Sequence, residues 1–152
     1  MSHTLFKDKI ANTLDTNQST LLVVIDNLRY DQWKVIEPSI NNYYKTQDDG
    51  LYFSILPTAT QYSRNAIFSG LMPSEMEKLF PQYWKNDNDE GGKNLYEAQF
   101  LGAQLKRLGF NNLKYEYFKI TNLKAGQKLA ESFKSKASNK FFPPSSLSFF
   151  QY

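Results

Sequence analysis

The sequence predicts an α/β fold in which an open, mostly parallel β-sheet is flanked by helices. Three observations lead to this class. A continuous aliphatic run, Thr20–Ile25, is what a strand buried on both faces requires. Stretches with the helical spacing of apolar residues alternate with short apolar stretches, an order typical of parallel crossovers. The 152 residues also suffice for one domain with its own core.

The first half of the chain opens with an amphipathic pattern over Thr4–Leu14, which predicts a short helix. The aliphatic run ends at Asp26. Because a buried strand does not accept a charge along its length, Asp26 is expected at the carboxyl end of the strand. A helix is expected over Asp31–Tyr44, kinked or broken at Pro38. Leu51–Leu56 is expected to form a second strand.

The second half continues the alternation of helix and strand patterns. Capping residues and terminal glycines set the expected bounds. In chain order, the expected elements are a helix from Thr58 or Thr60 to Gly70, a helix over Ser74–Phe80, a helix over Asn94–Leu108 closed by Gly109, a strand over Leu113–Ile120, and a helix over Thr121–Ala137 capped by Thr121 or Asn122.

Composition excludes several kinds of site. The chain has no cysteine and a single histidine, His3, so it supplies neither thiolate ligands nor an internal Ser-His-Asp triad. Its longest aliphatic run, Leu21–Ile25, is far too short for a membrane helix, and a cytoplasmic location is the default expectation. Basic residues predominate from Lys93 onward. We expect them to solvate helix and strand faces, with nucleic-acid binding as the alternative.

Two segments bring reactive groups to the expected carboxyl edge of the sheet. Asp26 ends the first strand, while Thr58 and Thr60 follow the second strand where a helix begins. Ligands of open α/β sheets bind beyond this edge, and a helix N-terminus offers unpaired N–H groups to a phosphate. A coordinated metal activates a hydroxyl without a histidine base. The pattern therefore predicts half of a metal-hydrolase site, with helix capping as the alternative role.

Long strings of residues point to a family. They include LVVIDNLRYDQW at Leu22–Trp33 and YFSILPTATQYSRNAIFSGLMP at Tyr52–Pro73. Further matching strings are MEKLFPQYW at Met76–Trp84, NDNDEGGKNL at Asn86–Leu95 and YFKITNL at Tyr117–Leu123. Together they resemble the PglZ domain, a branch of the alkaline phosphatase superfamily. Within that family the chain is most similar to the C-terminal output domain of a two-component response regulator linked to type IX secretion.

The resemblance implies an alkaline-phosphatase-like sheet that binds two zinc ions. It implies phosphatase or phosphodiesterase chemistry on a phosphodiester such as an oligonucleotide. Asp26 would be an acidic metal ligand. Thr60 would be both the nucleophile and a metal ligand, with Thr58 as the alternative nucleophile.

Arg64 and Asn65 lie one helical turn further along and are candidate phosphate contacts by the same resemblance. The alternative is that Arg64 pairs with Asp31 or Glu37, and that Asn65 only supports the start of the helix. The resemblance also allows a homodimer, and it implies no contact with a membrane.

The chain departs from the family in its metal donors. The superfamily's remaining ligands are aspartates and histidines, but no histidine follows His3. Residues 1–138 are therefore expected to be a partial, truncated PglZ domain. Residues 139–152 are expected to be a non-family tail that is disordered or results from a frameshift, since two prolines there exclude a central strand. The alternative function is that of a degenerate, non-catalytic fragment acting as a binding module.

Overall fold

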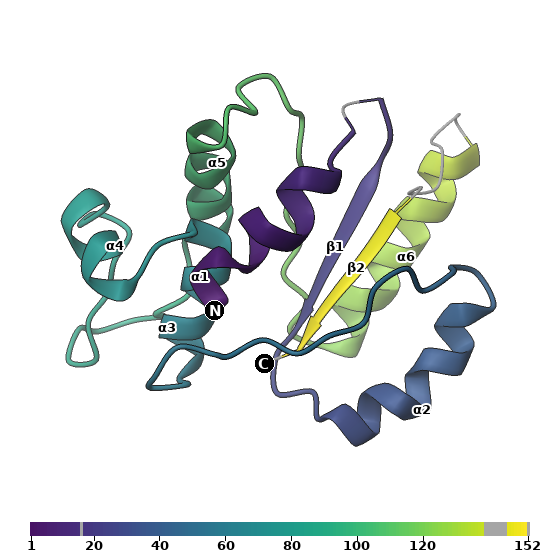
Figure 1. The fold of residues 1–152 in the computed structure, drawn as a ribbon, viewed down its shortest axis with the longest axis horizontal. Helices are drawn as coiled ribbons and strands as arrows, with labels where there is room; N and C mark the ends of the chain where they lie inside the picture. Colours follow the sequence, from purple (N-terminus) through teal and green to yellow (C-terminus); the bar gives the residue numbers. More distant parts are fainter. Residues whose placement is uncertain (16, 139–145, 152) are drawn as a thin grey trace.

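The computed structural model describes the backbone of residues 1–15, 17–138 and 146–151. Figure 1 shows α3, α4 and α5 on one side of the strands β1 and β2, and α2 at the opposite end. The elements in chain order are α1 (Ser2–Leu5), the π-helical turn η1 (Phe6–Ile10), the 3-10 turn η2 (Ala11–Thr13), β1 (Thr20–Ile25), α2 (Tyr30–Asn41), α3 (Thr60–Ser69), α4 (Pro73–Leu79), α5 (Glu97–Arg107), α6 (Leu123–Ser138) and β2 (Ser146–Gln151).

The helices follow the sequence pattern closely. α2 runs through Pro38 without the break that was one of the two predicted outcomes, and the kink stays a prediction. α3 ends at Gly70, which adopts a left-handed conformation with φ of 66°. The expected N-terminal helix is divided among α1, η1 and η2, but its apolar side chains Leu5, Phe6 and Ile10 are buried all the same. α6 is capped as predicted, because the side chain of Asn122 accepts a hydrogen bond from the backbone N–H of Ala125 at 2.9 Å.

The sheet differs from the prediction. β1 pairs in parallel with β2, from Thr20 opposite Ser146 to Ile25 opposite Gln151, and the sheet of the described residues has these two strands. Every residue of β1 is half-buried, whereas the sequence predicted a strand buried on both faces. The open, many-stranded sheet remains a prediction.

The strand predicted at Leu51–Leu56 is not formed in the structure. The segment has no ladder partner among the described residues, since the ladder of β1 is made with β2. Its side chains Leu51, Phe53 and Leu56 are 94%, 83% and 85% exposed. A strand needs a neighbouring backbone, which the local sequence does not provide.

The strand predicted at Leu113–Ile120 is not formed either. Side chains attach this segment to α5 and to the loop before it. The hydroxyl of Tyr115 donates to the carbonyl of Ala98 at 3.2 Å, and the ammonium of Lys119 donates to the carbonyl of Asn94 at 2.6 Å. These contacts replace the backbone ladder that the alternating pattern predicted.

The C-terminal segment also differs from the expected disorder. Ser146–Gln151 forms β2, because the prolines Pro143 and Pro144 precede this strand and leave its ladder donors intact. Residues 139–145 and 152 lie outside the described residues.

The hydrophobic core lies where α3, α5 and the N-terminal turns meet. Phe100 of α5 is fully buried, with Phe80 and Tyr83 packed edge-on against its ring at centroid distances of 6.0 Å. Gln104 fixes α5 against the end of α3 by donating to the carbonyls of Ile67 and Phe68 at 3.0 and 2.9 Å. This packing makes α3 a rigid support for the residues at its amino-terminal end.

Candidate functional site

Asp26 and Thr60 meet at one end of the molecule. Asp26 directly follows β1, and Thr60 is the first residue of α3. The hydroxyl Oγ1 of Thr60 donates to Oδ2 of Asp26 at 3.4 Å, across 34 positions of sequence. The first N–H groups of a helix have no partner within the helix and point out of its amino-terminal end, which here is the end where Thr60 lies.

Arg64 lies one turn further along α3 and bridges two carboxylates. Its Nη1 donates to the same Oδ2 of Asp26 at 3.3 Å, while its Nε and Nη2 both donate to Glu97, the latter at 2.8 Å. The Arg64 side chain is 14% exposed. The alternative pairings with Asp31 and Glu37 are wrong, since these residues bind Arg29 and Lys34 instead.

Glu97, the first residue of α5, is buried beneath the site. Besides its hydrogen bonds with Arg64, Glu97 accepts a hydrogen bond from the Tyr117 hydroxyl at 2.5 Å and forms an ion pair with Lys119 at 3.1 Å. Burial by itself raises the pKa of Glu97, but the hydrogen bonds from Arg64, Tyr117 and Lys119 outweigh it and hold that pKa below its usual value. Glu97 is therefore a carboxylate at neutral pH.

Asn65 and Thr58 are placed differently from Thr60. Asn65 is 1% exposed and donates to the carbonyl of Lys93 at 3.1 Å, so its amide faces the loop before α5. Thr58 is exposed and lies two residues before the helix. Among the described side chains, Thr60 forms a hydrogen bond with Asp26 and Thr58 does not. The roles of Asn65 and Thr58 stay predictions.

The loop before α5 also supports the site. The amide Nδ2 of Asn94 donates to the carbonyl of Thr60 at 3.1 Å, and the ammonium of Lys119 holds the carbonyl of Asn94. Sequence reasoning did not single out Glu97, Asn94 or Lys119. Each looked like an ordinary polar residue of a helix face, loop or strand, and no local signal marks a residue whose partner lies far away in the sequence.

The donor set does not fit the expected pair of zinc ions. Within the described residues, no three His, Cys, Asp or Glu side chains lie close enough together to hold a metal ion. Asp26 already accepts from Thr60 and Arg64, and three donors occupy the buried carboxylate of Glu97. Zinc takes about four ligands, so Asp26 and Thr60 alone supply too few.

His3 does not reach this site. It lines a cavity of about 240 Å³ together with Gly70 and Arg107. Gly70 follows the last residue of α3, so a ten-residue helix, about 15 Å long, separates this cavity from Thr60. The cavity therefore adds no donor to Asp26.

Comparison with protein families identifies the family of the chain. Residues 5–139 match the family described as the BREX system PglZ alkaline phosphatase-like domain. None of the curated proteins compared with the chain matches it. In the part of the chain that the structure describes, the helices are too short or too polar to span a bilayer.

Proposed function

The chain belongs to the PglZ family of alkaline phosphatase-like domains, and on that basis we propose that it binds a phosphate ester at the amino-terminal end of α3, with Thr60 as the nucleophile. One observation carries the proposal: the Thr60 hydroxyl and the Arg64 guanidinium both reach Oδ2 of Asp26. Attack on a phosphate ester requires a hydroxyl, a carboxylate that accepts the hydroxyl's proton, and a cation fixed close by.

The chemistry follows from these three side chains. Oγ1 of Thr60 forms a bond to phosphorus, and its proton passes to the Asp26 carboxylate. The bond from phosphorus to the ester oxygen breaks, and the departing oxygen takes a proton from water. Arg64 and the first N–H groups of α3 stabilise the negative charge on the phosphate oxygens. A water molecule then attacks phosphorus, the bond from phosphorus to Oγ1 breaks, and Oγ1 takes back the proton from the Asp26 carboxyl group.

Several finer points belong to the same proposal. A two-zinc site would need donors beyond Asp26 and Thr60, so we propose that this chain represents the amino-terminal part of a PglZ domain and has little activity alone. The proposed setting is a cytoplasmic response regulator of the PorX type, in type IX secretion. The proposed substrate is a phosphodiester such as a short oligonucleotide.

The test measures binding and turnover separately. Titration with phenyl phosphate, followed in a proton–nitrogen NMR spectrum, should shift the backbone signals at the start of α3. Hydrolysis of bis-p-nitrophenyl phosphate, with and without added zinc, should be slow in the unsubstituted chain and absent in Thr60→Ala. Thr58→Ala is the matched comparison, because it removes the other threonine of the same loop.

The outcomes separate the parts of the proposal. Turnover that survives Thr60→Ala and is lost in Thr58→Ala would assign the nucleophile to Thr58. Absence of both phenyl phosphate binding and turnover would refute the proposed site. Mass spectrometry that found about two zinc ions per chain would refute the view that the donor set is incomplete.

A second candidate function is that of a non-catalytic interaction module. The observation that favours it is the exposure of Leu51, Phe53 and Leu56 along one extended segment. Exposed large apolar side chains that lie close together in the sequence are candidates for an association surface, and a homodimer is the simplest partner. Light scattering over a concentration series tests it: a monomer at every concentration refutes the idea, and association that serine substitutions at these three positions abolish supports it.

A further inference from the structure

Glu97 is the most deeply buried carboxylate whose role the proposed chemistry leaves open. Its residue is 1% exposed, and it begins α5, on the far side of Arg64 from Asp26. A buried carboxylate is costly unless hydrogen bonds and an opposite charge compensate it. Arg64, Tyr117 and Lys119 provide that compensation from three separate segments.

The contact between Arg64 and Glu97 fixes the direction of the guanidinium. Nε and Nη2 both bind Glu97, one to each carboxylate oxygen. A planar guanidinium held by two parallel hydrogen bonds has little freedom to rotate. Nη1, which lies in the same plane at the edge away from Glu97, then points to Oδ2 of Asp26, the atom that also accepts a hydrogen bond from the Thr60 hydroxyl.

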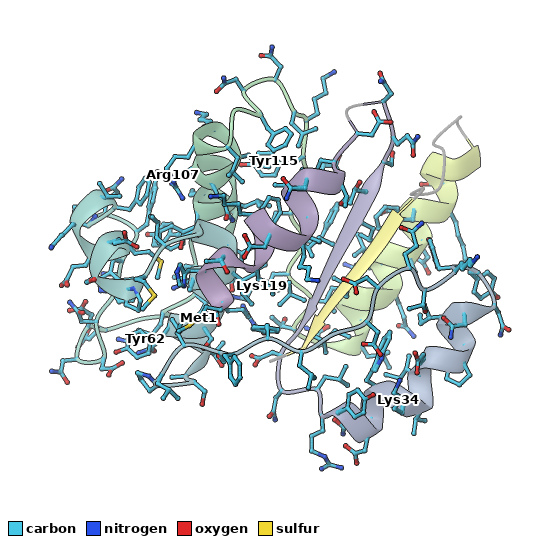
Figure 2. The ribbon with its side chains drawn as sticks, viewed as in Figure 1. Met1, Lys34, Tyr62, Arg107, Tyr115 and Lys119 are labelled. Carbon is cyan, nitrogen blue, oxygen red and sulfur yellow. The ribbon has the colours of Figure 1, made fainter. Side chains whose placement is uncertain are left out.

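Glu97 is itself held in place from the opposite side. The Tyr117 hydroxyl and the Lys119 ammonium both bind Oε2, and Lys119 also donates to the carbonyl of Asn94. Figure 2 shows Lys119 between the helices α3 and α5 on one side and the strand β1 on the other. The segment predicted to be a strand thus anchors the carboxylate that orients Arg64.

We propose that Glu97 is a positioning residue, which holds Arg64 so that Nη1 faces a phosphate oxygen bound beside Thr60. This inference rests on the proposed function. Glu97 touches neither the substrate nor the reacting atoms, and it acts through Arg64. A phosphate oxygen entering the site would take Nη1 from Asp26, while Nε and Nη2 keep their hold on Glu97.

The experiment combines two measurements on the full chain. The first is the Nε–H signal of Arg64 in a proton–nitrogen spectrum, assigned by its loss in Arg64→Lys. The second is the affinity for phenyl phosphate. Glu97→Gln should shift or broaden the Arg64 signal and weaken binding about tenfold, the size of one charge-assisted hydrogen bond. Glu131→Gln, at an exposed position of α6, is the matched control and should change neither.

A double-mutant cycle separates positioning from a merely structural role. Lysine at position 64 keeps the charge but cannot bind both oxygens of Glu97. If Glu97 acts through Arg64, Glu97→Gln weakens binding in the unsubstituted chain and adds little in the Arg64→Lys background. Glu97→Asp, which keeps the charge, should restore part of the affinity, and it replaces Glu97→Gln in both measurements if that variant does not fold.

The contrary results are distinct. Equal losses of affinity in both backgrounds, or an unchanged Arg64 signal in Glu97→Gln, would overturn the positioning role. Absence of phenyl phosphate binding in the unsubstituted chain would refute the proposed function. In that case the Arg64 signal still decides whether Glu97 holds the guanidinium.

Discussion

The region built on α3 and α5 contrasts with the region formed by α2 and the segment that follows it to Leu56. In the first, Ala66, Ile67 and Phe100 are fully buried. In the second, every residue of α2 is described and none is buried, and Val35 is 78% exposed. Both regions carry helical or extended apolar patterns of similar strength in the sequence.

The difference lies in what each region packs against. α3 contacts α5, the N-terminal turns and the aromatic side chains around Phe80, so its apolar side chains are covered. α2 has no comparable cover among the described residues, and within Leu51–Leu56 the side chain of Ile55 reaches the core whereas Leu51, Phe53 and Leu56 stay exposed. An amphipathic pattern indicates that one face of an element can be buried. That face is buried only where another segment of the chain, or a partner molecule, packs against it. The candidate site is attached to the covered region.

The largest expected effect separates the two regions directly. Phe100→Ala should lower the free energy of unfolding by about 3–5 kcal/mol, because it empties a fully buried position. Phe53→Ala, at a position that is 83% exposed, should change it by less than about 0.5 kcal/mol. Urea denaturation of both variants measures this. Similar losses would show that the segment around Phe53 is covered in solution.

A smaller effect concerns charge in the two regions. Because the pKa of Glu97 is lowered in the folded state, its carboxylate stabilises the fold above its unfolded pKa of about 4.3. That contribution is lost as pH falls through the folded pKa. Glu97→Gln should cost about 2–3 kcal/mol at pH 7 and make stability depend less on pH in the acid range.

Asp31→Asn in α2 is the matched test for the exposed region. Hydrogen bonding to Arg29 also lowers the pKa of Asp31, but this pair is open to solvent, which screens it. The acid dependence of stability should therefore stay close to that of the unsubstituted chain. A flattening as large as in Glu97→Gln would contradict the difference in burial.

The smallest expected effect concerns the backbone. Gly70 has a φ of 66°, and a Cβ there would meet the carboxamide of Gln104, so Gly70→Ala should cost about 1–2 kcal/mol. Gly50, in the exposed region, has open space around it, and Gly50→Ala should leave stability within about 0.5 kcal/mol. Thermal unfolding of the two variants makes the comparison. A neutral Gly70→Ala would show that the end of α3 can rearrange.

Sequence reasoning predicted the helices better than the strands. The bounds of α3, α5 and α6 follow from apolar spacing and capping residues, which act within one or two turns. The strands predicted at Leu51–Leu56 and Leu113–Ile120 did not form, and β2 appeared where a tail was expected. Backbone ladders join segments far apart in the sequence, so a local pattern cannot select the partner.

The candidate site shows the same division. The meeting of Asp26 and Thr60 was expected, because both follow elements predicted to end at the same edge. The partners of Arg64 were not predicted, because Glu97 is 33 positions away in the sequence and looks like any acidic residue in the first turn of a helix.

The sequence by itself determined the family, the positions of the helices, and the absence of cysteine and of histidine after His3. The tertiary structure alone decided that β1 pairs with β2, that Glu97 is buried, and that Arg64 lies between two carboxylates. The physical reason is range: side-chain spacing and caps act between neighbours along the chain, whereas burial, strand ladders and ion pairs depend on distant segments that meet only in the folded protein.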